Sequence, residues 1–199
     1  MSSAESGRGT QTGERKGSFH EEMTSGSYDP IAVLMEEHRQ FLHRLERFAN
    51  EVRGVSNRDR IPPVLVRQIA EFSRFLERDV DGWHGRKEEQ ALFPSLKRHL
   101  SVDEGPIAVL LEEHELLRQH QRVIERDARK LERDPGATEA LSEIGSAESQ
   151  VRGLLTDHID KEDRILFPMA RELLTDRELG EVAAFCQEID ALRDGTSER

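Results

Sequence analysis

The chain has 199 residues, a length that suits one domain or one domain with tails. Its 40 Asp and Glu residues outnumber its 29 Lys and Arg residues, and the net charge of −11 repels nucleic-acid phosphates and anionic membrane surfaces. A single cysteine, Cys186, excludes an internal disulfide. Because we find no signal peptide and no apolar run long enough to span a membrane, we expect a cytoplasmic protein with no nucleic-acid or membrane partner.

The N-terminal residues 1–27 are rich in Ser, Gly and charge, and we expect a disordered tail there. A first helix should begin at Asp29-Pro30, an N-cap followed by proline, with apolar residues at steps of three and four. A second helix should run from Pro62-Pro63 to about Phe93, bent at Gly82 or Gly85.

A third helix is predicted over about 106–132, ended by an Asp-Pro-Gly turn at 134–136, and a fourth over about 138–174. A short fifth helix over 175–192, capped by Thr175 or Asp176, should precede a frayed tail at 193–199. This pattern predicts an all-α fold: residues 28–174 form an antiparallel up-down four-helix bundle, built from two αα-hairpins.

The two predicted hairpins are related by an internal repeat. DPIAVLMEEH at 29–38 matches GPIAVLLEEH at 105–114 in eight of ten positions. HGRKEEQALFP at 84–94 matches HIDKEDRILFP at 158–168 in six of eleven positions. Each half therefore carries a His on its first helix and an H-x-x-x-E motif on its second.

Six of the repeated side chains can face one volume. Residues four apart share a helix face, so His84 and Glu88, and likewise His158 and Glu162, can hold the same ion. His38 and His114 lie in the apolar stripes of the other two helices. Four imidazoles with two carboxylates fit iron or manganese, and two bridging Glu would leave two His for each metal. With an oxo or hydroxo bridge, each iron keeps one open position for a small ligand.

These motifs, with LFP after both H-x-x-x-E sequences, resemble the hemerythrin-like HHE cation-binding family over residues 29–172. The resemblance implies an antiparallel four-helix bundle with a non-haem di-iron centre that meets O2, peroxide or nitric oxide. The metal ligands it implies are His38, His84, Glu88, His114, His158 and Glu162.

Two positions depart from the oxygen-carrying hemerythrins. Arg118 replaces a further His on the third helix, which favours redox chemistry over reversible oxygen carriage. Asp163 satisfies the spacing of the last-helix Asp of those carriers, but the match with Glu88 favours Glu162. His43 is a candidate auxiliary ligand, whereas the pairs Glu36-Glu37 and Glu112-Glu113 are expected to be solvated.

The preferred function is therefore that of a di-iron protein that binds or reacts with O2, H2O2 or NO, in a response to oxidative or nitrosative stress or in sensing it. Whether the chain is an enzyme, and which protein partner it has, stay open. The alternative is a metal-free or zinc-stabilised helical module that acts through protein contacts.

Overall fold

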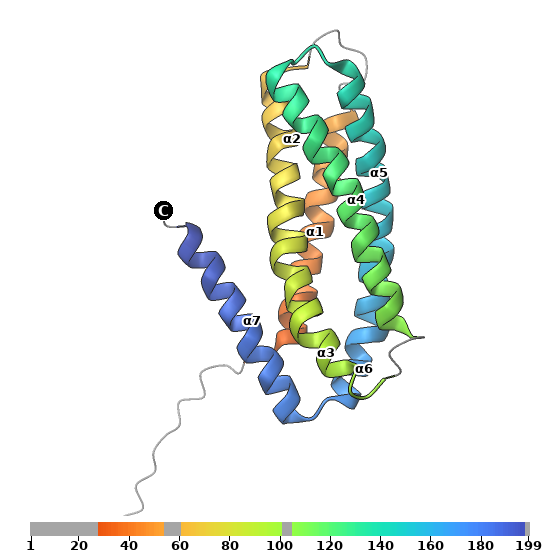
Figure 1. Cartoon of the computed structure of the whole chain (residues 1–199), viewed down its shortest axis with the longest axis vertical. Helices are drawn as coiled ribbons and strands as arrows, with labels where there is room; N and C mark the ends of the chain where they lie inside the picture. The colour runs from red at the N-terminus through yellow and green to blue at the C-terminus, as the bar shows by residue number, and fades with distance from the viewer. Residues whose placement is uncertain (1–27, 54–60, 101–104, 198–199) are drawn as a thin grey trace, which may run out of the picture.

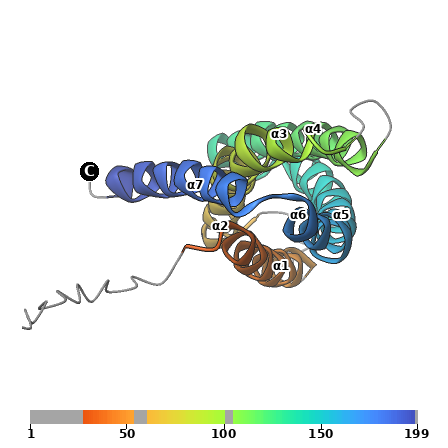
Figure 2. The same ribbon diagram turned by 90° about the horizontal axis from the view of Figure 1, so that it is seen from below.

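The computed structural model describes residues 28–53, 61–100 and 105–197, so the predicted tail at 1–27 lies outside the described residues. Within these ranges every regular element is a helix, which confirms the all-α prediction. In chain order the elements before the last helix make up four helical rods. These rods lie side by side, and successive rods run in opposite directions (Figure 1). In the end-on view the rods surround a common axis, and a fifth helix extends from one side (Figure 2).

The first rod is α1 (Pro30–Arg53), and it begins where the sequence predicts. The side chain of Asp29 accepts hydrogen bonds from the backbone N–H groups of Ile31 and Ala32, at 3.0 and 3.2 Å. These bonds satisfy two of the N–H groups that a helix start leaves without partners.

The second rod changes its winding along its length. It comprises α2 (Pro63–Phe75), the π-helical segments η1 (Leu76–Gly85) and η2 (Glu88–Leu92), and α3 (Phe93–Leu96). Pro94 has no N–H group, and in a regular α-helix its ring would collide with a carbonyl of the preceding turn. A wide turn before Pro94 avoids this collision, since Phe93 N–H donates to Glu88 O, five residues back, rather than to a carbonyl four residues back. A Cβ at Gly82 would lie 3.0 Å from the carbonyl oxygen of Glu77, so the wide turns of η1 depend on glycine there.

The second hairpin repeats this plan. It comprises α4 (Pro106–Arg133), α5 (Thr138–Lys161), the π-helical segment η3 (Glu162–Leu166) and α6 (Phe167–Leu173). Phe167 N–H bonds to Glu162 O, so the second LFP sequence also follows a wide turn. The predicted turn after α4 is present: Asp134 accepts from Gly136 N–H at 2.9 Å, and Pro135 O accepts from Ile61 N–H at 3.0 Å.

The core is divided into two apolar clusters. One includes Phe41, Phe72 and Ile159, and the other includes Leu34, Phe93 and Phe167. His38 lies between Leu34 of one cluster and Phe41 of the other along α1, and it is itself buried. The buried polar layer therefore lies between two apolar ones, where a charged group is costly without a partner.

The fifth helix, α7 (Asp176–Ser197), is longer than the predicted 175–192 segment and continues into the residues expected to be frayed. Gly195 alone disfavours helix by about 1 kcal/mol, which is too little to end it there. Thr175 is the cap: Glu178 N–H donates to its hydroxyl, and Thr175 N–H donates to the Glu178 carboxylate at 3.0 Å. This reciprocal arrangement is a capping box.

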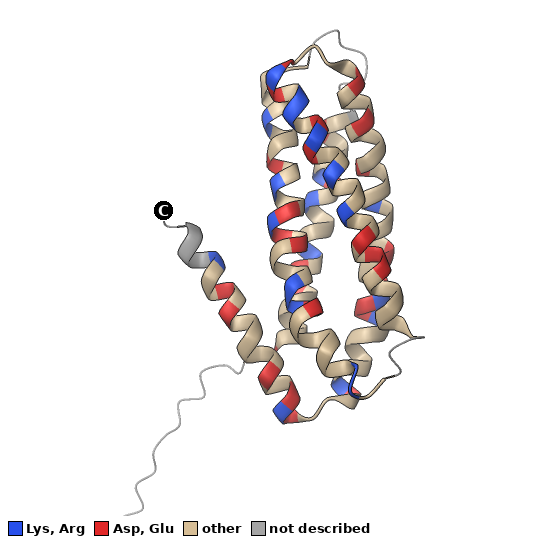
Figure 3. Cartoon of the chain, in the orientation of Figure 1, with Lys and Arg blue, Asp and Glu red and all other residues tan. Residues whose placement is uncertain are grey.

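Acidic and basic residues are interspersed along the rods (Figure 3). Many form exposed pairs one helical turn apart, such as Arg164 with Asp160 at 2.7 Å, which contribute about 0–1 kcal/mol each. Among the described residues, no helix is both long enough and apolar enough to cross a bilayer.

Candidate metal centre

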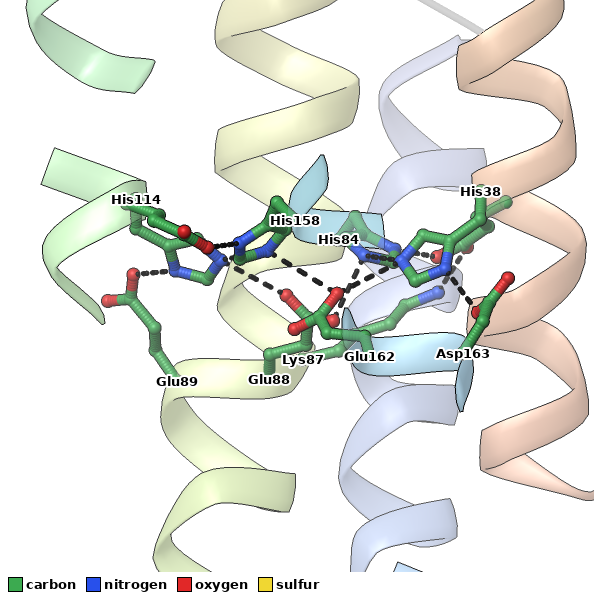
Figure 4. A network of polar contacts seen from close by, with 11 residues as sticks. His38, His84, Lys87, Glu88, Glu89, His114, His158, Glu162 and Asp163 are labelled. Carbon is green, nitrogen blue, oxygen red and sulfur yellow. Dashed lines mark hydrogen bonds and ion pairs between the residues drawn. The ribbon is translucent and has the colours of Figure 1, made fainter. Parts of the chain in front are cut away.

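The structure brings all six predicted residues together in the buried polar layer (Figure 4). Each rod contributes at least one: α1 supplies His38, the second rod supplies His84 and Glu88, α4 supplies His114, and the fourth rod supplies His158 and Glu162. The two Glu are the first residues of η2 and η3, so the wide turns before Pro94 and Pro168 position both carboxylates. This placement gives the LFP sequences a structural role next to the site.

The six side chains form two groups of four that share both carboxylates. His38 and His84 make one group with Glu88 and Glu162, and His114 and His158 make the other. In each group the candidate ligand atoms lie within 4.8 Å of one another. The Nε2 atoms are 3.0 Å apart in the first imidazole pair and 3.1 Å apart in the second, and the two carboxylates lie between the pairs (Figure 4).

Each shared carboxylate approaches both imidazole pairs. Glu88 Oε1 lies 3.1 Å from Nε2 of His84, and its Oε2 lies 3.4 Å from Nε2 of His114. Glu162 Oε2 lies 3.3 Å from Nε2 of His38 and 3.3 Å from Nε2 of His158. Both carboxylates therefore lie within reach of both imidazole pairs.

The four rings are held in place from outside by four further carboxylates. Each Nδ1 lies 2.7–3.0 Å from a carboxylate oxygen, in the pairs His38–Asp163, His84–Glu37, His114–Glu89 and His158–Glu113. A carboxylate only accepts, so Nδ1 donates and Nε2 is the nitrogen that faces the centre. A metal-binding His is typically oriented by such a partner.

Sequence reasoning missed these outer partners. Glu37 and Glu113 were expected to be solvated, and that expectation is wrong: their side chains are only 13% and 12% exposed and bind rings on neighbouring rods. Each directly precedes a His of the repeat, and Glu89 and Asp163 directly follow the shared Glu. This repeated adjacency was the available signal, but the hydrogen bonds cross between rods, which helical periodicity does not predict.

Two repeated lysines extend the outer layer. Lys87 Nζ donates to Glu37 Oε1 at 2.6 Å, and Lys161 Nζ donates to Glu113 Oε1. The two lysines differ in burial, because Lys87 is fully buried whereas the Lys161 side chain is 40% exposed. The two halves of the repeat therefore make the same Lys–Glu contact, but the lysine is buried in the first half and partly exposed in the second.

Without a bound ion the pKa values within each imidazole pair diverge. Burial opposes the charged form, yet the Glu88 carboxylate and its neighbours raise the pKa of His84 and of His114 to about 9. Burial lowers the pKa of His158 to about 4 and also lowers that of His38. Two adjacent rings cannot both carry charge in a dry layer, so one of each pair is driven toward the neutral form.

The two central carboxylates diverge in the same way. Burial and the charge of Glu88 raise the pKa of Glu162 well above its usual range. Burial also acts on Glu88, but the charge of His84 holds the pKa of that carboxyl well below its usual range. The paired anions therefore oppose each other unless a cation lies between them.

The donor set fits a metal. All four carboxylate oxygens of Glu88 and Glu162 are buried and make no hydrogen bond, and their near neighbours are the inward imidazole nitrogens. Buried carboxylate oxygens are normally paired, so each of these four has a place for a bond to a cation. Imidazole nitrogen together with carboxylate oxygen suits iron and other first-row transition metals.

A cavity between η1, α4 and α5 reaches this layer from one side. His84, His114 and His158 border it, and its other lining residues are largely apolar: Leu76, Val80, Gly85, Leu117, Val151 and Leu155, with Asp81, Arg118 and Gln121. The Arg118 side chain lies beside the cavity and donates to Asp81 at 2.7 Å and to Glu89. At the repeat position equivalent to Leu117 stands Phe41, whose ring packs 5.0 Å from the His84 ring.

The remaining candidates lie elsewhere. His43 is exposed and belongs to neither group of four, and Asp163 contacts His38 Nδ1 rather than the centre. Cys186, to which the sequence assigned no function, is buried in the apolar cluster that α7 shares with α1.

Comparison with known proteins agrees with this geometry. The Hemerythrin HHE cation binding domain family matches residues 29–170. The iron-sulfur cluster repair protein YtfE of Yersinia pseudotuberculosis serotype IB (strain PB1/+) is 31% identical over 142 residues, which cover 70% of this chain and 62% of that protein. The protein of the same name from Escherichia coli O139:H28 (strain E24377A / ETEC) is 29% identical over 141 residues, with the same coverage. The chain thus matches less than two thirds of the length of these curated relatives. Because the family match covers most of the chain and contains all six central residues, the chain belongs to the hemerythrin HHE cation binding domain family.

Proposed function

We propose that the chain holds two iron ions, one at each imidazole pair, and reacts with a small oxidant or radical: O2, H2O2 or NO. The observation that carries this proposal is the sharing of Glu88 and Glu162 by both groups of four ligand atoms. A single ion needs only one such group. Two groups with common carboxylates would suit a pair of ions, and Glu88 and Glu162, whose four oxygens make no hydrogen bond, would hold that pair.

The protein's part in the chemistry is to hold and orient. Bound iron would supply one-electron steps between ferrous and ferric states and would bind the small ligand. The outer carboxylates fix the four rings with Nε2 inward, as the contact between Glu37 and His84 at 2.9 Å illustrates. The apolar clusters on either side keep bulk water from the layer, which strengthens each charge interaction in it.

The cavity beside η1 supports a small and uncharged ligand. Most of its walls are apolar, and the charge of Arg118 is already engaged by Asp81 and Glu89. Dioxygen, peroxide and nitric oxide are of a size and polarity that such a path admits. We infer that the ligand approaches the centre on the side of His114 and His158.

Metal content of site variants tests the proposal, on the full-length chain reconstituted anaerobically with ferrous iron. Glu88→Ala and Glu162→Ala should each lose the paired site, because each carboxylate belongs to both groups. His38→Ala should lose one ion and keep the other, since it removes a ligand from one group only. Glu112→Ala, an exposed residue two positions before His114, is the matched control and should keep two ions.

The outcomes separate the candidates. Two ions retained in both Glu variants, with helicity unchanged by circular dichroism, would overturn the bridging assignment. Zinc alone in the wild-type chain, or no metal after reconstitution, would favour the protein-interaction module. Visible absorbance that changes on adding peroxide or NO to the iron-loaded chain, but not to the zinc-loaded chain, is expected for the proposed reaction.

Repair of iron–sulfur clusters is a second candidate, favoured by the printed function of the relatives. The test adds the iron-loaded chain to an iron–sulfur protein damaged by nitric oxide, in the presence of sulfide and reductant. If the chain repairs clusters, their absorbance returns faster than with free ferrous iron at the same concentration. Equal rates would exclude this function for the chain by itself.

A further inference from the structure

The fifth helix lies outside the family match yet reaches the outer layer of the metal centre. The match ends at residue 170, whereas α7 covers Asp176–Ser197 and packs against α1, η1 and η2. Asp190 of this helix lies 2.6 Å, through Oδ1, from Nζ of the buried Lys87. The contact joins a segment outside the family match to a residue next to Glu88.

From Asp190 a continuous series of polar contacts leads to the centre. Lys87 also donates to Glu37 Oε1 at 2.6 Å, and the other oxygen of Glu37 accepts from His84 Nδ1 at 2.9 Å. On the outer side, the hydroxyl of Tyr28 donates to Asp190 Oδ2 at 2.9 Å. Asp190 and Tyr28 therefore fix Lys87, and Lys87 fixes the carboxylate that orients His84.

Among the described residues, no second carboxylate contacts Lys161, the equivalent lysine of the second hairpin. Lys161 contacts Glu113, which in turn accepts from His158 Nδ1 at 3.0 Å, but the Lys161 side chain is 40% exposed. The fifth helix packs on the first arm, and there Lys87 is fully enclosed between two carboxylates. A buried cation with two carboxylate partners has far less freedom than a solvated one with one partner.

We propose that Asp190 is a positioning residue for the metal centre, because it holds His84 through Lys87 and Glu37. The ion at His38 and His84 is therefore bound more tightly than the ion at His114 and His158. The inference rests on the proposed function, because it presumes an ion at each pair. It adds that α7 makes the two halves of a repeated site unequal. The ion at His38 and His84 is then chiefly structural, and the ion at His114 and His158, both of which border the cavity, is the more exchangeable one.

Metal release tests this inference without using activity. The full-length chain is loaded with ferrous iron under anaerobic conditions and mixed with an excess of a ferrous chelator, and release is followed by absorbance. The wild type should release iron in two phases of equal amplitude. Loss of a partner that directly orients a ligand weakens metal binding by about 10–100-fold. Because Asp190 acts on His84 through Lys87 and Glu37, Asp190→Asn should accelerate the slow phase by up to about tenfold and leave the fast phase unchanged.

Three further variants make the result specific. Tyr28→Phe removes only the donor to Asp190 and should accelerate the slow phase to a smaller degree, which keeps the test valid if Asp190→Asn folds poorly. Lys161→Met removes the equivalent lysine of the second hairpin, which contacts Glu113, and should change the fast phase alone. Glu188→Gln removes one negative charge from an exposed position of α7 and should change neither phase.

The outcomes distinguish this inference from the proposed function. A wild-type chain with fewer than two irons overturns both. Two irons whose slow phase is insensitive to Asp190→Asn and Tyr28→Phe, or a single release phase in the wild type, overturn the positioning role alone. Equal acceleration of both phases by Asp190→Asn would also overturn it, since that pattern reflects general loosening of the fold. Two Mössbauer doublets of equal area in the wild type, one of which shifts in Asp190→Asn, would support it independently.

Discussion

Nε2 of His38 lies 3.0 Å from Nε2 of His84, in a layer closed to water above and below by apolar side chains. Both rings already use Nδ1 to bind a carboxylate outside the layer. At this distance the two inward nitrogens either share one proton or present two lone pairs to the same point. The second arrangement is the one that a metal ion stabilises, and the same geometry recurs at His114 and His158.

Bound metal should therefore raise the thermal stability of the chain. An ion that binds only the folded state stabilises it by about 2.7 kcal/mol when its free concentration is 100 times the dissociation constant. Calorimetry of the chain with and without ferrous iron, or with zinc as a redox-inert substitute, should show a higher unfolding temperature with metal. Glu88→Ala should abolish the increase, and an increase of the same size in that variant would contradict the site.

Metal uptake should release protons near neutral pH. In the metal-free chain the pKa of His84 and of His114 is raised to about 9, so both rings are charged at neutral pH and must lose a proton to bind an ion. Proton release on metal addition, measured in weak buffer, should be largest below pH 9 and fall as the pH rises through about 9. Uptake with no proton release at neutral pH would contradict this description.

The same shifts make a signed prediction for stability. A raised His pKa stabilises the metal-free fold below the unfolded value of about 6.5. This contribution is lost as the pH rises through about 9. In urea unfolding of the metal-free protein, a His84→Gln variant should therefore show a smaller loss of stability over this window than the wild type.

The cavity can be closed with a residue that the repeat itself supplies. Leu117→Phe places at the cavity the side chain found at the equivalent position 41, where it packs against His84. Adding bulk to a packed core typically lowers the free energy of unfolding by about 1–3 kcal/mol. Because the new ring enters free space, we expect a loss of about 1 kcal/mol. Reaction of the iron-loaded variant with NO or peroxide should slow several-fold while its iron content stays the same.

The reciprocal variant, Phe41→Leu, provides the control. It should open space beside His84 without closing the cavity, so the reaction rate should stay the same or rise. A Leu117→Phe variant that reacts as fast as the wild type would show that the ligand takes another path.

The start of α7 should be sensitive to acid. The backbone N–H of Thr175, with His99 and the Thr175 hydroxyl, lowers the pKa of Glu178 to about 2. A lowered carboxyl pKa stabilises the fold above the unfolded value of about 4.3, and this stabilisation is lost as the pH falls from there toward about 2. Urea unfolding of the metal-free chain should show that Glu178→Gln removes this acid-dependent loss. Glu181→Gln, an exposed neighbour, should behave as the wild type.

The helices and the central six residues were predictable because they depend on local patterns and on duplication. Asp29 caps α1 as predicted, since capping is decided within one turn. The repeat placed each His and Glu on a known helix face, and burial of the apolar stripes then brought these faces together. In the structure Glu162 belongs to both groups of four, whereas its neighbour Asp163 contacts His38 Nδ1.

The outer layer was not predictable from local patterns. Glu37 is adjacent to His38 but binds His84, which is 47 residues away and on another rod. The contact of Lys87 with Asp190 likewise depends on how α7 packs, and a polar residue within the apolar stripe of α7 gives no indication of its partner. Such contacts follow from tertiary packing, which helical periodicity alone does not encode.

The most direct test of the central claim is the metal content of the wild-type chain, measured by plasma mass spectrometry after expression in iron-supplemented cells and anaerobic ferrous reconstitution. The shared carboxylates predict two irons per chain, with Mössbauer parameters of a coupled pair. One iron per chain, zinc alone or no metal would contradict a di-iron centre held between the two imidazole pairs.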